Sequence, residues 1–588
     1  MEIRSPFRLP RKTPFGVGEQ LAEWATGLNQ LDKFYAQRPA RCDTQQFLRY
    51  TLDVLGIDYQ IIHGQLNDIP IQGATVVVAN HPLGGVEGVI LAELLLMIRS
   101  DVQILANQYL KTVPELDELF IGVDVFEGKG AHAANLKAMR SASRHLENGG
   151  LLLMFPAGEV SQLVGRNEQQ LADKEWSRSV SRLIRQHRAT SVPVYIQGQN
   201  SKRFYLAGKI HPLLRTLMLG RELLNKQQKP IKLAIGETIK YKEVKELTDH
   251  QMVNYLRLNT YLLNNSADNH SLPNSSLDNA EPIADPRPLA VIQQELASLP
   301  SNHHLLTHQQ FEVYCSDAAH IPNLLHEIGR LREINFRQVG EGTGNACDLD
   351  SFDQHYLHLF VWDSEQQCLV GAYRLGLVDE ILYQQGIEGF YSRTLFHYQQ
   401  PFLDQLEHSI ELGRSVIAAQ YQKSMSALLL LWKGIATFIS RHPHYTHLFG
   451  PVSISNEYSQ QTRQLIAETM TLHHYDAQKA SLVSASNPLP TQSRHWTSNM
   501  LSALSDLQLL SRVIARVEPG RSVPVLLRQY LSLNGKIVSF NLDPAFNNAL
   551  DGLILVDLRN VPVKTLARYM GSQAAQCYLT YHQERNGA

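Results

Sequence analysis

Two hydrophobic patterns alternate from the N-terminus to residue 263: short apolar runs rich in β-branched residues, and longer runs with helical spacing. The run ATVVVAN is followed by VEGVILAELLLMIRS and then by VQILANQ. GGLLLMFPAG, TSVPVYIQG and KPIKLAIGE come later. This alternation predicts an α/β fold, an α/β sandwich around a largely parallel sheet.

The second half shows a similar mixture of patterns. HLFVWD, CLVGAYRLGLV and THLFGPVSIS read as strands, and residues 425–440 read as a long helix. Residues 264–288 are rich in Asn, Ser, Asp and Pro and almost free of large apolar side chains, so they cannot bury enough surface to fold. We therefore expect a first domain at 1–263, a flexible linker at 264–300 and a second mixed α/β domain at 301–588.

Composition narrows the classes of protein to consider. A chain of 588 residues is too long for one core, and a net charge of −2 argues against a nucleic-acid partner. The 5 cysteines show no CxxC spacing, which indicates a reducing compartment and no metal site. The apolar stretches 88–98 and 427–439 are too short to span a bilayer, and the basic N-terminus lacks the apolar run of a secretory signal.

The first candidate site is NHPLGGVEG, where a strand ends. His81 can act as a general base if a carboxylate such as Glu87 fixes its tautomer. Gly84 and Gly85 would let backbone N–H groups approach a developing oxyanion. The alternative is a simple turn in which His81 caps the following helix.

Three further stretches, LFIGVDVFEGKG, FPAGEVS and VPVYIQGQNS, follow in order. With the His81 stretch they resemble the four ordered blocks of the glycerolphosphate and lysophospholipid acyltransferase family. The resemblance implies that His81 deprotonates an acceptor hydroxyl, which attacks an acyl thioester. It also implies that Glu87 orients His81, and that Gly158 and Ser161 shape the acceptor side.

The chain departs from that family at two points. The family pattern is His-x4-Asp, whereas Glu87 stands one position further on. In the third block Ala157 replaces a Glu, and Val160 replaces the Arg that the family uses toward the acceptor's phosphate. Since Arg is favoured for phosphate binding, its loss predicts an acceptor without a phosphate.

Residues 211–229 place leucines among basic side chains. Such a segment could lie in the surface of an anionic bilayer, and the alternative is an ordinary packed helix.

The second candidate site begins with LREINFRQVGEGTGNACDLDSFD, which includes Arg337, Asp348 and Asp353. Arg374 lies in a predicted strand, and Glu411 and Arg414 would be close neighbours in a helix. An array of carboxylates and arginines suits an acceptor that carries an ammonium and a carboxylate. The alternative is ordinary surface ion pairing. For Asp543 and Asp551 further on, the two interpretations are a functional role and turn formation, and we favour turn formation.

The order of these residues resembles the acyl-homoserine-lactone synthases, which are GNAT-like enzymes. The later stretches YQKSMSALLLLWKGIATFI and LFGPVSISNEY resemble the ornithine N-acyltransferases, formerly grouped as putative haemolysins. The resemblance implies that Glu411 and Arg414 belong to the active centre. It implies that Arg337, Asp348, Asp353 and Arg374 hold the acceptor or its loop. YQKSMSA lacks the GNAT pyrophosphate motif, so we expect acyl carrier protein as donor and no cofactor.

Together the halves resemble the bifunctional ornithine lipid synthases. This implies N-acylation of ornithine with a 3-hydroxyacyl group by the second domain, then O-acylation of the lyso-ornithine lipid by the first. It further implies peripheral contact with the cytoplasmic face of a bacterial inner membrane. The alternatives are acylation of glycine or lysine, a membrane-active haemolysin without catalysis, or a chain with only one active domain.

Overall fold

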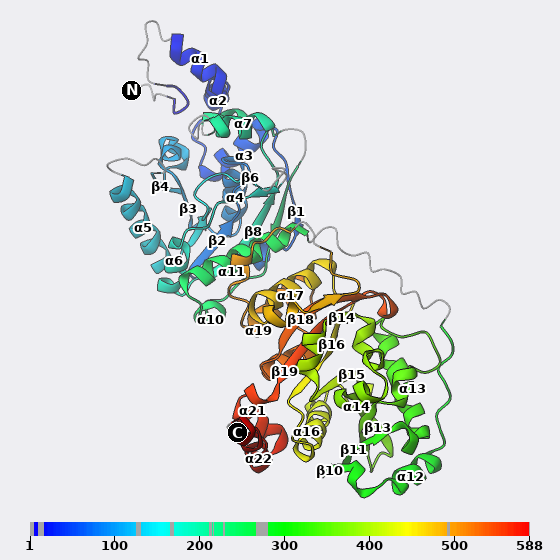
Figure 1. Cartoon of the computed structure of the whole chain (residues 1–588). Helices are drawn as coiled ribbons and strands as arrows, with labels where there is room; N and C mark the ends of the chain where they lie inside the picture. Colours follow the sequence, from blue (N-terminus) through cyan, green and yellow to red (C-terminus); the bar gives the residue numbers. More distant parts are fainter. Residues whose placement is uncertain are drawn as a thin grey trace. The chain divides into compact units, whose positions relative to one another are not determined.

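The computed structural model describes residues 5–9, 17–124, 131–164, 170–210, 215, 217–226, 230–265, 280–490 and 494–586. The chain forms two compact units (Figure 1). Unit 1 comprises Met1–Asn269 with Ser493–Pro519, and unit 2 comprises His270–Gln492 with Gly520–Ala588. Both units are mixed α/β, as the sequence pattern predicts. In the described part of the chain no helix is both long and apolar enough to cross a membrane.

Unit 1 is built on a sheet of seven strands in the order β1-β9-β8-β2-β5-β3-β4. All neighbouring strands are parallel except β8 and β9. The strands are β1 (Tyr59–His63), β2 (Thr75–Ala79), β3 (Val102–Asn107), β4 (Phe120–Val123), β5 (Leu151–Met154), β8 (Thr190–Gln197) and β9 (Ile231–Ile235). A small hairpin, β6 (Gln162–Val164) and β7 (Gln170–Ala172), follows β5.

Helices cover both faces of this sheet, which is why every residue of β2 is buried. One layer contains α3 and α4, which pack together, and the other contains α5, α6 and α11. The helices of unit 1 are α1 (Val17–Thr26), α2 (Leu28–Ala36), α3 (Thr44–Leu55), α4 (Val86–Leu96), α5 (Ala131–Glu147), α6 (Ser179–His187), α7 (Lys202–Ile210), α9 (Leu219–Leu223), α10 (Tyr241–Val244), α11 (Asp249–Leu262) and α19 (Leu507–Val517).

Unit 2 is built on a sheet of eight strands in the order β10-β11-β12-β13-β15-β16-β19-β18. Only β15 and β16 are parallel neighbours. The strands are β10 (His304–His308), β11 (Phe311–Asp317), β12 (Leu357–Asp363), β13 (Cys368–Leu377), β15 (Ser409–Ile417), β16 (His447–Ile454), β18 (Lys536–Asp543) and β19 (Ala549–Asp557). A separate pair, β14 (Phe396–Tyr398) and β17 (Val483–Ala485), covers a second apolar cluster.

Helices α13 and α16 pack on opposite faces of this sheet. Phe360 of β12 lies in the cluster under α13, while its neighbour Leu359 contacts Gly434 of α16. The helices of unit 2 are α12 (Leu289–Ser298), α13 (Pro322–Gln338), α14 (Val378–Gln384), α15 (Gln400–Leu406), α16 (Met425–Arg441), α17 (Gln460–His473), α18 (Ala477–Ala480), α20 (Val525–Ser532), α21 (Val563–Met570) and α22 (Ser572–Asn586).

Two domain boundaries in the structure differ from those expected from the sequence. Residues 289–298 form α12 instead of linker, because Ile292 is buried in the core of unit 2. Residues 493–519 belong to unit 1, although the expected second domain ran without a break to residue 588. Within unit 1, Arg516 of α19 pairs with Glu243 and donates to the Tyr255 hydroxyl. The amphipathic pattern of α19 predicts a helix but does not tell which core it joins.

Candidate active sites

His81 lies just beyond the carboxyl end of β2, in the middle of the unit 1 sheet. The neighbouring parallel strands β5 and β8 end beside it, and such an edge is where open α/β sheets place ligands. Phe155, just after β5, stacks on the His81 ring with centroids 4.6 Å apart. Asn200, beyond β8, donates to the carbonyls of Pro82 and Leu83. The three strand ends therefore fix the His81 loop.

Glu87 holds His81 in one orientation. Its Oε1 lies 2.9 Å from His81 Nδ1 and also accepts from the N–H groups of Leu83 and Gly84, at 2.9 Å each. Burial would raise the pKa of this fully buried carboxyl, but His81 and the hydrogen bonds lower it below the usual range. An ionised Glu87 keeps the proton on Nδ1, so Nε2 can accept a proton from a hydroxyl.

The glycines near His81 serve the turn. Gly84 has a φ of 99°, and its N–H is already donated to Glu87, so it is not the oxyanion donor that we expected. This left-handed turn brings Glu87 onto His81 despite the extra residue between them. Gly85 is the N-cap of α4 and has ordinary helical dihedrals. Gly158 has a φ of 71° in an exposed turn after β5, where its N–H donates to the Phe155 carbonyl.

Asp173 is a residue of this site that the sequence analysis missed. Its Oδ1 accepts from the Ser161 hydroxyl at 2.5 Å and from the His81 N–H at 3.2 Å. Ser161 is 2% exposed and donates its own N–H to the His81 carbonyl at 2.7 Å. Trp176 donates to the other carboxylate oxygen of Asp173. Ser161 and Asp173 therefore position the His81 backbone. No motif in the sequence links Asp173 to this site.

Two basic side chains near the Gly158 turn share one acidic partner. Glu159 pairs with Arg215 at 2.6 Å and with Lys174 at 3.1 Å. Burial would raise the pKa of Glu159, but these two cations lower it. Both cations share the one carboxylate of Glu159, so the group keeps a single net positive charge.

In unit 2, Glu411 and Arg414 lie on strand β15, so the helical spacing expected for them is wrong. β15 pairs with β16 only as far as Glu411 and Phe449, and beyond this point the two parallel strands separate. A cavity of about 280 Å³ lies in unit 2 where they part. Its lining includes Leu412–Ser415 of β15, Pro451–Ser453 of β16 and residues of β18, β19 and α20.

Arg414 is the buried cation of this cavity. It has a φ of 49°, outside the usual strand region, and its Nε lies 3.0 Å from Asp348 and its terminal nitrogen 3.5 Å from Asp350. The rings of Tyr391 and Phe546 each lie 4.6 Å from its guanidinium carbon. Burial opposes the charge, but the neighbouring Tyr391 and the two aspartates raise the pKa of Arg414. A fixed guanidinium of this kind suits a carboxylate ligand.

Arg374 and Asp353 lie behind Arg414, outside the cavity lining. Arg374 pairs with Asp350 at 2.7 Å and with Asp353 at 3.4 Å, and Asp353 also pairs with Arg332 at 2.8 Å. Burial would raise the pKa of Asp353, but the two arginines lower it. This network holds Asp350, one of the two aspartates beside Arg414. Arg374 and Asp353 therefore bind other protein side chains, and their expected role around the acceptor stays a prediction.

Glu411 and Arg337 are also engaged by the protein. Glu411 is 1% exposed and accepts from the Tyr356 hydroxyl and the Ser392 N–H, and burial raises its pKa. It lies outside the cavity lining and fixes the loop that carries Tyr391 into it. Arg337 binds Glu333 and the carbonyl of Asn345, so it fastens the glycine-rich loop after α13.

Three carboxylates line the same cavity: Glu341, which the sequence pattern did not single out, and Asp543 and Asp551, for which turn formation was favoured over a functional role. Glu341 accepts from the Ser453 hydroxyl at 2.6 Å, and burial with the nearby Glu457 and Asp543 raises its pKa to about 7. Burial, Asp543 and Glu341 raise the pKa of Asp551.

Asp543 also forms the turn that we expected of it, by accepting from the Ala545 N–H. Asp551 is not a turn residue: it lies in the buried strand β19, and a charged residue within the run ALDGLILVD is the signal that could have indicated it.

Comparison with known proteins agrees with this division into two sites. The acyltransferase family pattern matches residues 29–270, and the pattern of the GNAT acetyltransferase domain matches residues 331–433. The chain is 29% identical to a glycine N(alpha)-acyltransferase of Phocaeicola vulgatus over 45% of this chain and 85% of the relative. It is 30% identical to the enzyme of that name from Bacteroides thetaiotaomicron, over 38% and 69%.

A third relative is the lyso-glycine lipid O-acyltransferase of Phocaeicola vulgatus. It is 30% identical over 34% of this chain and 71% of the relative. The chain is therefore an acyltransferase, and it belongs to the family of these N- and O-acyltransferases.

Proposed function

We propose that this chain makes a doubly acylated amino-acid lipid and that the amino acid is ornithine. Unit 2 transfers a 3-hydroxyacyl group from acyl carrier protein to the α-amine of ornithine. Unit 1 then esterifies the 3-hydroxyl of the lyso-ornithine lipid with a second acyl chain. In each step a thioester carbon–sulfur bond breaks, an amide or ester bond forms, and the nucleophile's proton passes to a protein base.

The His81–Glu87 pair supports the second step. Nδ1 of His81 is held at 2.9 Å by the carboxylate, which leaves Nε2 to take the proton of the attacking hydroxyl. The buried Val160, which stands where the family has its phosphate-binding Arg, supports an acceptor that carries no phosphate. The relatives named lyso-glycine lipid O-acyltransferase act on an acceptor of this kind by their name.

The carboxylates in the unit 2 cavity carry the proposal of ornithine. Arg414 lines the cavity, where it can contact the substrate carboxylate. Its positive charge is already offset by Asp348 and Asp350. Glu341, Asp543 and Asp551 therefore give the cavity a surplus of negative groups. Glycine brings one ammonium, whereas ornithine brings a second one on its side chain. Burying three carboxylates near one another is unfavourable unless cations join them, so the cavity favours a diamino acid.

Glycine is the second candidate, because relatives that match this chain are named glycine N(alpha)-acyltransferase. Lysine carries the same second ammonium as ornithine and belongs in the same test. Both alternatives leave the order of the two acylations unchanged.

We also propose a peripheral contact with a membrane, since the lyso-lipid acceptor resides there. Exposed apolar side chains on α1 and α7 of unit 1 support it, among them Trp24, Leu206 and Ile210, at 67%, 61% and 72% exposure. The basic residues Lys202 and Arg203 lie at the start of α7. Of the amphipathic segment expected at 211–229, residues 211–214, 216 and 227–229 lie outside the described residues.

Lipid mass spectrometry tests the proposal. Bacterial cells that lack aminolipids would express the chain and be fed labelled ornithine, glycine or lysine in separate cultures. Label from ornithine should enter a doubly acylated lipid. An Asp551→Asn variant should lose most of this product, while Asp404→Asn, on the exposed surface of α15, should keep it. Label from glycine alone in the lipid would refute the assignment of ornithine.

A further inference from the structure

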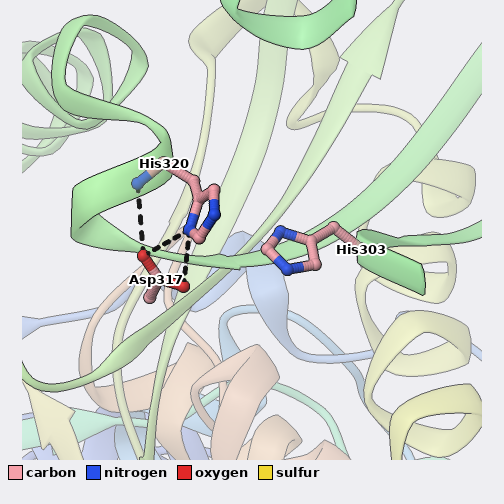
Figure 2. A group of neighbouring side chains, drawn as sticks. All are labelled: His303, Asp317 and His320. Carbon is pink, nitrogen blue, oxygen red and sulfur yellow. Dashed lines mark hydrogen bonds and ion pairs between the residues drawn. The ribbon is translucent and has the colours of Figure 1, made fainter. Parts of the chain in front are cut away.

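Three side chains that commonly bind metals gather at the β10 edge of the unit 2 sheet. His303 ends a short 3-10 turn directly before β10, Asp317 ends β11, and His320 ends the 3-10 turn Ala318–His320 that follows. One ligand atom from each lies within 4.8 Å of the other two. In Figure 2 the two imidazole rings lie near each other in an edge-to-face arrangement, and the Asp317 carboxylate lies beside His320.

We propose that His303, Asp317 and His320 form a binding site for a divalent transition-metal ion of the zinc type. Two imidazoles and one carboxylate match the nitrogen and oxygen ligands that such ions prefer, and water would complete a four-coordinate shell. Hard cations such as Mg²⁺ fit poorly, because they favour oxygen ligands.

Surrounding contacts prepare the ligands for this role. His303 Nδ1 lies 3.0 Å from the hydroxyl of Ser316, a residue only 1% exposed, so Nε2 is the nitrogen left to bind the ion. This is the arrangement that orients ligating histidines in metal sites. Asp317 is held in place because its carboxylate accepts the His320 N–H at the start of the 3-10 turn.

A hydrogen bond now occupies the position that the ion would take. His320 Nδ1 lies 2.8 Å from both oxygens of Asp317, which is somewhat shorter than the separation of two ligands on one zinc ion. A small side-chain rotation would admit the ion between them. Binding would then displace the shared proton to water, with no redox change.

The position of the cluster points to a structural role. Among the residues that the structure describes, β10 is an edge strand, and its one neighbour in the sheet is β11. An ion held by His303 on one side and by Asp317 and His320 on the other would tie the start of β10 to the end of β11. β12 and β13 separate these strands from β15, and none of the three ligands lines the acceptor cavity.

Titration of the full-length, chelator-treated protein with Zn²⁺ and Co²⁺ tests this inference. We expect one ion per chain, a four-coordinate Co²⁺ absorption spectrum and a rise in the Tm of unit 2. His303→Ala, His320→Ala and Asp317→Asn should each weaken binding about tenfold or more. Asn at position 317 can still cap the 3-10 turn, so this variant loses the charge and not the fold.

His308→Ala is the matched control, because His308 is an exposed histidine at the other end of β10. It should bind the ion and gain stability as the unaltered protein does, which matters in a chain with 24 histidines. Retained N-acylation would report that each variant is folded. Absence of a stoichiometric ion in the unaltered protein, or equal binding by the three ligand variants, would overturn the proposal.

Discussion

At the scale of the residue, we propose that His81 is the general base of unit 1. His81→Ala should lower kcat/KM for O-acylation by about 10²–10⁴-fold, because the hydroxyl loses its proton acceptor. N-acylation should be unchanged, so the singly acylated lipid should accumulate. Assays of both reactions with purified protein would measure this. His132→Ala, an exposed histidine of α5, is the control, and loss of both activities in His81→Ala would contradict the division of labour.

Glu341 should set the pH dependence of N-acylation. Its pKa is raised to about 7, so below that pH the carboxyl is neutral and cannot attract the acceptor's ammonium. We expect kcat/KM to rise with pH through about 7 and the Glu341→Gln variant to lose that dependence. An exposed carboxylate on the same unit, Glu407, offers the matched Gln control. An unchanged pH profile in Glu341→Gln would argue against this role.

The same residue couples pH to folding. Because the folded-state pKa lies above the usual 4.5, the folded protein holds the Glu341 proton more tightly than the unfolded chain does. The contribution of Glu341 to stability should therefore be lost as pH rises from 4.5 to about 7. Glu341→Gln should raise the Tm of unit 2 above that window and leave it unchanged below. Thermal unfolding at two pH values would decide this.

Some site residues follow from the sequence, and others do not. The pairing of His81 with Glu87 can be predicted from the sequence because a strand, a glycine turn and a helix start fix their positions locally. The contact of Asp173 with the His81 N–H cannot be predicted, because the two residues are far apart in the sequence and meet only in the folded protein. Asp551 was interpreted as a turn former, since nothing local reveals that its strand borders a cavity.

At the scale of the element, the glycine turn after β2 tests how local backbone shape supports the site. Gly84 has a φ of 99°, and an added Cβ would lie 2.5 Å from the Leu219 side chain. Gly84→Ala should destabilise unit 1 by about 1–2 kcal/mol and weaken O-acylation. Gly85→Ala is the matched control, since a Cβ there meets nothing within 4 Å. Equal effects of the two substitutions in chemical denaturation would contradict this account.

Elements were predicted more reliably than their local distortions. The strand-helix alternation predicts both sheets, and residues 425–440 do form a helix. The stretch ELGRSVI was expected to begin a helix, but it lies in β15. The reason is tertiary: the segment pairs with β13, and its separation from β16 opens the cavity. The spacing of charged residues in the sequence does not indicate either strand pairing.

At the scale of the whole molecule, Arg516 shows how residues 493–519, near the C-terminal end of the sequence, stabilise unit 1. It pairs with Glu243 at 2.8 Å and donates to Tyr255, and Glu243 is nearly buried. Arg516→Ala would leave that carboxylate without its closest cation and should destabilise unit 1 by about 2–3 kcal/mol. Arg512→Ala, whose side chain is 46% exposed and lies 3.4 Å from Glu243, should cost less. Thermal unfolding followed through the loss of O-acylation would compare them.

Because residues 493–519 belong to unit 1, the gene cannot be divided at the linker into two parts that each encode a whole unit. The relatives named for the N- and O-acylation steps are separate proteins. Here a cut in the gene at the linker would give an upstream product without α19 and a downstream product with a helix foreign to its own core. A cut at the linker therefore cannot separate the coding sequences of the two units.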